Sequence, residues 1–141
     1  MPAALDLNDP EHAAVERRFR SEIALWLTTV SPKGQPQSTP IWFHWDGESF
    51  LFFSQPARPK LTNIGANPLV SLHLVGDLEG EDVVTIEGTA ALDPSAPSGD
   101  QIPSYIEKYL GLIDRFGWTT SSFAADYSVA VRVTPTRFRL L

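Results

Sequence analysis

Short alternating apolar segments separated by tight turns constrain the fold of this chain more than any other feature. Ile23 to Val30 alternates in this way and ends at the turn Ser31-Pro32-Lys33-Gly34, and a second such segment, 37–45, ends at Asp46-Gly47. Alternation predicts half-buried strands, and Asp-Gly predicts a hairpin because both residues tolerate positive φ. Turns this short cannot carry a parallel crossover. We therefore expect an antiparallel sheet that closes, or nearly closes, into a barrel.

The rest of the chain extends this pattern. Further strands are expected at 49–54, 69–75, 83–92, 129–133 and 138–140. Helices are expected from Asp9-Pro10, at 61–65 behind Pro59, and from Pro103, where Ile106, Tyr109, Leu110 and Ile113 form an apolar stripe. The sequence thus predicts one mainly β domain over residues 1–141, with six or seven antiparallel strands and two or three short helices.

Composition excludes several classes of function. Eleven basic against 17 acidic residues give a net charge of −6, which disfavours a surface for nucleic acid or anionic lipid. The absence of cysteine excludes disulfides, thiolate metal sites and cysteine nucleophiles. The histidines His12, His44 and His73 lack metal-ligand spacing, so no metal site is predicted. The acidic N-terminal segment and the short apolar runs indicate a cytoplasmic protein without a membrane span.

One stretch, Ser54 to Asn63, has a composition suited to an anion. A hydroxyl at a strand end is followed by Arg58 and Lys60 where a helix begins, and free backbone N–H groups at a helix start favour a phosphate. The alternative is that the two cations form a solvated helix cap and that Ser54 merely ends its strand.

A second candidate is Thr39-Pro40-Ile41-Trp42. Proline within a strand removes one donor from the hydrogen-bond ladder, which leaves neighbouring backbone groups free for a ligand or, alternatively, marks an edge strand. The tryptophans Trp26, Trp42, Trp45 and Trp118 can form flat walls for a ring system or simply belong to the core.

Several segments, in this order, carry a family resemblance. They are Trp26-Leu27-Thr28-Thr29-Val30, Gly34-Gln35-Pro36, Thr39-Pro40-Ile41-Trp42-Phe43, Ser54, Lys60 to Ile64, Asn67-Pro68, Val70-Ser71-Leu72-His73, Glu87-Gly88-Thr89-Ala90, Tyr127-Ser128-Val129, Arg132-Val133 and Pro135-Thr136-Arg137. Together they cover nearly the whole chain. The sequence resembles the pyridoxamine 5'-phosphate oxidase-like, FMN-binding split barrels, and within them a branch of deazaflavin-dependent reductases that use coenzyme F420.

The resemblance implies a homodimer with two cofactor sites at the subunit interface. The implied cofactor is FMN or coenzyme F420. Residues implied to line the ring are Thr39, Pro40, Ile41 and Trp42, and those implied to surround the phosphate are Ser54, Gln55, Arg58, Lys60 and Asn63. Trp42 and Trp118 are expected to shape the substrate pocket.

The resemblance also implies an oxidoreductase that transfers hydride between the bound cofactor and a small conjugated organic molecule. In such proteins the cofactor carries the reaction, which agrees with the lack of a catalytic triad motif. Family members that oxidise vitamin B6 have basic residues on the second strand and an Arg-Leu-x-Pro-type C-terminal segment. Here those places read Ser38 to Trp42 and Arg137 to Leu141, which argues against that substrate. The alternatives are a carrier of a flavin, deazaflavin or haem-like ligand, and a ligand-free structural barrel.

Overall fold

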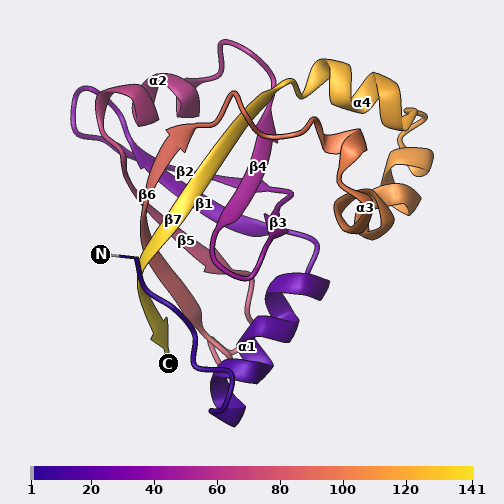
Figure 1. Cartoon of the computed structure of the whole chain (residues 1–141). Helices are drawn as coiled ribbons and strands as arrows, with labels where there is room; N and C mark the ends of the chain where they lie inside the picture. Colours follow the sequence, from indigo (N-terminus) through magenta and orange to yellow (C-terminus); the bar gives the residue numbers. More distant parts are fainter. Residues whose placement is uncertain (1) are drawn as a thin grey trace.

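Residues 2–141, which the computed structural model describes, build one antiparallel sheet of seven strands in the order β2-β1-β5-β6-β7-β4-β3. The sheet curls into a split half-barrel whose two end strands are β2 and β3 (Figure 1). The strands are β1 (Leu25–Val30), β2 (Pro36–Ile41), β3 (His44–Trp45), β4 (Phe50–Ser54), β5 (Leu69–Leu74), β6 (Val84–Leu92) and β7 (Val129–Leu140). The predicted mainly β split barrel is confirmed.

The helices lie at the ends and sides of the sheet (Figure 1). They are α1 (Pro10–Ser21), α2 (Pro59–Ala66), α3 (Pro103–Arg115) and α4 (Thr120–Asp126), with a short 3₁₀ turn η1 (Gly99–Gln101). Helix α1 begins as predicted, with Asp9 Oδ1 accepting a hydrogen bond from the Glu11 N–H at 2.9 Å. Among residues 2–141, no helix combines the length and apolarity needed to cross a membrane.

The expected number of helices was wrong, because α4 had not been foreseen. Thr119 caps α4 by accepting from the Ser122 N–H at 3.0 Å, and the Ser122 hydroxyl lies close enough to the Thr119 N–H to accept from it at 2.9 Å. The usual sequence signal for this reciprocal cap has Glu or Gln at the position of Ser122, so the pattern is easy to miss.

Two strand predictions also required correction. The expected strand 37–45 is interrupted after Ile41, so that Trp42 and Phe43 lie between β2 and β3. The two expected closing strands form a single strand, β7, in which Pro135 is accommodated because the register with β6 shifts between Glu87 and Gly88. A Cβ on Gly88 would lie 2.8 Å from the Thr134 carbonyl oxygen, so this close approach requires glycine.

Strand β4 is buried on both faces and divides the apolar side chains into two clusters. Phe50 and Phe52 point into the barrel interior, which α1 closes with Val15 and Phe19. Leu51 and Phe53 belong to an outer cluster with Tyr105, Tyr109, Ile113 and Phe123 of α3 and α4. The outer cluster holds the two helices against the sheet and thereby positions the cavity described below.

The Tyr109 hydroxyl connects α3 to the barrel, and its removal is expected to be costly. It accepts from the Phe43 N–H at 2.9 Å and donates to the Ile23 carbonyl at 2.6 Å. Tyr109→Phe leaves the buried Phe43 N–H and the partly buried Ile23 carbonyl without this partner, so we expect a loss of about 1–3 kcal/mol in the free energy of unfolding. Urea denaturation measures it. Tyr127→Phe is the matched control and should change stability little, because no hydrogen bond in residues 2–141 uses that hydroxyl; equal effects of both changes would contradict the assignment.

Candidate functional site

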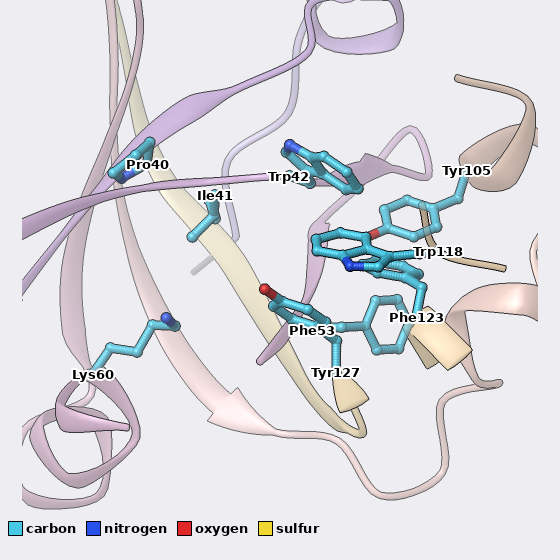
Figure 2. Close-up of a pocket in the computed structure, with 9 residues that line it drawn as sticks. All are labelled: Pro40, Ile41, Trp42, Phe53, Lys60, Tyr105, Trp118, Phe123 and Tyr127. Atoms are coloured by element: carbon cyan, nitrogen blue, oxygen red, sulfur yellow. The ribbon is translucent and has the colours of Figure 1, made fainter. Parts of the chain in front are cut away.

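Two neighbouring cavities share one side chain, Lys60. We call the first the aromatic cavity; it encloses about 160 Å³. Its lining comes from β2, the β2–β3 link, β4, α2, α3, α4 and the segments flanking α4. The lining residues are Pro40, Ile41, Trp42, Phe53, Lys60, Tyr105, Trp118, Phe123 and Tyr127. Figure 2 shows Lys60 reaching toward this cavity from α2, while the aromatic rings gather on the opposite side.

The second, the polar cavity, encloses about 240 Å³ between β1, β2 and the start of α2. Its lining is Thr29, Gln37, Ser38, Thr39, Arg58, Pro59 and Lys60. Hydroxyl and amide groups thus face the two cations across this space. A ligand with an anionic group in the polar cavity and a flat apolar part in the aromatic cavity would contact Lys60 with both parts.

Lys60 is half-buried, yet no carboxylate within residues 2–141 forms an ion pair with it. Burial lowers the pKa of its ammonium group, and the nearby Arg58 guanidinium lowers it further. A cation held this way gains from an anionic ligand, because the ligand replaces lost hydration and offsets the repulsion from Arg58.

The loop between β4 and α2 places the two cations. Ala57 adopts the left-handed backbone conformation at φ 59°, which is uncommon for a residue other than glycine and often marks a ligand site. After this bend Arg58 occupies the N-cap of α2, where it offers no side-chain cap, and its guanidinium donates to the Gln55 side-chain oxygen. The positive end of the α2 dipole therefore faces the same region as Arg58 and Lys60.

Two of the residues expected around a phosphate make hydrogen bonds within the protein. Ser54 is buried, and its hydroxyl donates to the Gln55 carbonyl at 2.8 Å. The buried Asn63 amide donates to the Thr29 hydroxyl at 2.9 Å and to the Gln37 side-chain oxygen at 2.8 Å, which ties α2 to β1 and β2. In this structure the charged donors at the corner are Arg58 and Lys60.

The segment Thr39 to Trp42 runs along both cavities. Thr39 lines the polar cavity, whereas Pro40, Ile41 and Trp42 line the aromatic one. Pro40 lies in β2, the end strand of the sheet, and pairs with Trp26 of β1. A missing ladder donor costs little in an end strand. The edge-strand interpretation is therefore right, and the same segment also borders the cavity.

The four tryptophans have different environments. Trp45 is in the barrel core, and Trp26 stacks on His73 with ring centroids 6.4 Å apart. Trp42 and Trp118, which the sequence analysis placed together, have centroids 6.3 Å apart at the aromatic cavity. No sequence pattern pointed to Phe53, Tyr105, Phe123 or Tyr127, which complete the aromatic wall. The ring centroid of Phe123 lies 5.5 Å from that of Trp42 and 5.0 Å from that of Tyr127.

The curled antiparallel sheet, with its cationic loop beside an aromatic cavity, places this protein among the split barrels. The family model described as pyridoxamine 5'-phosphate oxidase matches residues 11–141, and the chain belongs to this family.

Individual relatives differ in what their names describe. A pyridoxine/pyridoxamine 5'-phosphate oxidase of Bacteroides fragilis is 33% identical over 89 residues, which cover 62% of this chain but only 37% of that protein. A solved F420 reductase is 31% identical, with a TM-score of 0.63 over 88% of this chain and 94% of its own. The haem storage protein HutZ of Vibrio cholerae is 18% identical with a TM-score of 0.62, over 90% of this chain and 92% of its own, and shares the fold.

Proposed function

We propose that the protein is an oxidoreductase that binds FMN or coenzyme F420 and transfers hydride between it and a small conjugated organic molecule. Lys60 and Arg58 would hold the phosphate, and the segment Thr39 to Trp42 would border the ring. When bound, either cofactor supplies the hydride chemistry. The chain's own residues would bind and orient the two ring systems and exclude water from them.

The observation that carries this proposal is the half-buried, unpaired Lys60 at the junction of the polar and aromatic cavities. A phosphate needs the cations and hydroxyls of the first cavity, and a conjugated ring needs the flat walls of the second. The likeness to the F420 reductase, at 31% identity over most of both chains, is the reason to include F420 beside FMN as a candidate cofactor.

A homodimer and a cytoplasmic location are part of the same proposal. Phe116 and Trp118 are 51% and 36% exposed, and Trp118 lines the aromatic cavity. Large aromatic side chains with this exposure are enriched at protein interfaces, so a second copy that covers them would also close the cavity.

A non-catalytic carrier of a flavin, deazaflavin or haem-like ligand is the second candidate. It is favoured by the lining of the aromatic cavity, where, among residues 2–141, the groups able to donate a proton are limited to the Lys60 ammonium and the Tyr105 and Tyr127 hydroxyls. Burial raises the pKa of the Tyr105 hydroxyl, so this group is a poor proton donor.

Titration of the protein separately with FMN and with F420 tests binding, followed by absorbance and by tryptophan fluorescence. We expect one cofactor to bind and to quench fluorescence, because Trp42 and Trp118 line the proposed ring site. Size-exclusion chromatography with light scattering reports whether the bound form is a dimer. Failure of both cofactors to bind would contradict the reductase and the flavin carrier alike.

Turnover then separates the two candidates. The reduced form of the cofactor that binds is mixed with a panel of conjugated acceptors, and its oxidation is followed by absorbance. Protein-dependent oxidation supports the reductase. Tight binding without oxidation of the cofactor by any acceptor supports the carrier.

A further inference from the structure

A third cavity lies between α1, β3 and α3, outside the site described above. It encloses about 110 Å³, and we call it the basic cavity. Its polar lining consists of Arg20, His44, Ser104 and Lys108, with Trp45 and Tyr105 among its aromatic walls. No carboxylate of residues 2–141 is part of the lining, and Lys60 does not reach it. Tyr105 borders both this cavity and the aromatic cavity.

Lys108 is held here without an ionic partner. Its Nζ lies 3.9 Å from the centroid of the Phe43 ring, and none of the ion pairs within residues 2–141 involves it. Burial lowers the pKa of Lys108 to about 8, and the more distant Glu22 carboxylate opposes this only in part. The ammonium group is therefore poorly hydrated and incompletely neutralised.

His44 lies on the opposite side of the cavity from α3, with its ring 6.5 Å from that of Tyr105. Burial is the main cause that lowers the pKa of His44, with Lys108, Arg20 and Arg132 lowering it further and Asp46 raising it. Within residues 2–141, no hydrogen bond involves the His44 imidazole, and its ring borders the basic cavity.

The carboxylates around the basic cavity are all paired with other groups, and one of them, Glu16, pairs with the lining residue Arg20. Glu16 accepts from Arg20 Nε at 2.6 Å and from Trp45 Nε1 at 2.6 Å. Glu22 pairs with Arg18, and Asp46 accepts from the Ser49 N–H and pairs with Arg132. These contacts occupy the acids, so Lys108 and His44 are left facing the cavity.

We propose that the basic cavity binds a small tetrahedral oxyanion, namely a sulfate or a phosphoryl group. A volume of about 110 Å³ leaves room for a single such group. Arg20, His44, Lys108 and the Ser104 hydroxyl approach from three elements and offer donors to several oxygens at once, as a tetrahedral anion requires. This site is independent of the proposed cofactor site.

Sulfate is the probe of choice, because its charge stays constant through the pH range where Lys108 titrates. Anion binding favours the protonated forms of Lys108 and His44, so affinity should fall as pH rises through about 8 and should increase at lower pH. The other charged groups near these two are Arg20 and Glu16 of α1, Glu22 at the C-cap of α1, Asp46 of the β3–β4 turn and Arg132 of β7. Arg20 remains charged throughout.

The test follows the histidine ring signals by NMR during a sulfate titration at constant ionic strength. We expect the His44 signals to shift and the pKa of His44 to rise with sulfate, while His12 and His73 serve as internal references. Lys60→Met removes a cation from the other site and should leave the His44 response unchanged. Lys108→Met should weaken sulfate binding by about 10-fold to 150-fold while it retains the apolar stem over Phe43.

Thermal unfolding of Lys108→Met, and of Lys108→Gln as a second variant, shows whether the fold is intact. A His44 signal that does not respond to sulfate, or responds equally in folded Lys108 variants, would overturn the proposal. Phenyl phosphate distinguishes the source of the anion: binding like sulfate indicates that the cavity admits a phosphoryl group of a larger molecule, and exclusion limits the site to the free oxyanion.

Discussion

Replacing Lys60 with alanine is expected to weaken cofactor binding by about 10-fold to 150-fold. A charge-assisted contact to phosphate contributes about 1.5–3 kcal/mol, and about 1.4 kcal/mol corresponds to a factor of ten in affinity. Lys60 has no competing ion pair within residues 2–141 and faces both cavities, so little else in the site can replace it. Fluorescence titration of the variant with the cofactor that binds the unmodified protein measures the loss.

Arg17→Ala is the matched control for this change. Arg17 is exposed on α1, away from both cavities, and its removal alters net charge by the same amount. We expect its cofactor affinity to match that of the unmodified protein. If Lys60→Ala keeps full affinity with an intact fold, Lys60 does not bind the phosphate.

Replacing Phe50 with alanine is expected to lower the free energy of unfolding by about 3–5 kcal/mol. Phe50 is fully buried at the centre of the barrel interior, where its ring centroid lies 4.6 Å from that of Trp45 and 5.0 Å from that of Phe19. The truncation leaves a cavity under α1, and domains of this size are stable by only about 5–15 kcal/mol. Urea denaturation monitored by circular dichroism gives the difference.

Leu78→Ala provides the comparison for Phe50. Leu78 is fully exposed in the acidic turn between β5 and β6, so its truncation should change stability by less than about 0.5 kcal/mol. A loss below about 1 kcal/mol for Phe50→Ala would show that the barrel interior repacks around the missing ring.

Local signals in the sequence predicted the parts of the fold that depend on neighbouring residues. The cap at Asp9, the turn at Asp46-Gly47 and the proline in the first turn of α2 each specify their backbone within a few residues. The continuous strand β7 could not be predicted in this way, because its passage through Pro135 depends on the bulge at Gly88 in another strand. Helix α4 was missed because serine replaces the acidic residue of the common cap.

The residues of the candidate site also differ in whether local sequence could predict them. Arg58 and Lys60 could be predicted because both belong to one strand-to-helix loop, and the structure places both at the polar cavity. The roles of Ser54 and Asn63 depend on hydrogen bonds whose direction no spacing reveals, including the contact from Asn63 to Thr29 across 34 positions. Phe53, Phe123 and Tyr127 meet only because α3 and α4 fold back against β4, which is a long-range event.

The segment between β6 and β7 supplies most of one wall of the aromatic cavity, whereas Arg58 and Lys60 belong to α2 and the loop that precedes it. Tyr105, Trp118, Phe123 and Tyr127 all come from this insertion, and the barrel interior does not depend on their identity. The aromatic wall can therefore change in evolution while Arg58 and Lys60 stay in place. We expect related proteins to share the barrel and to differ mainly in the helical segment between β6 and β7.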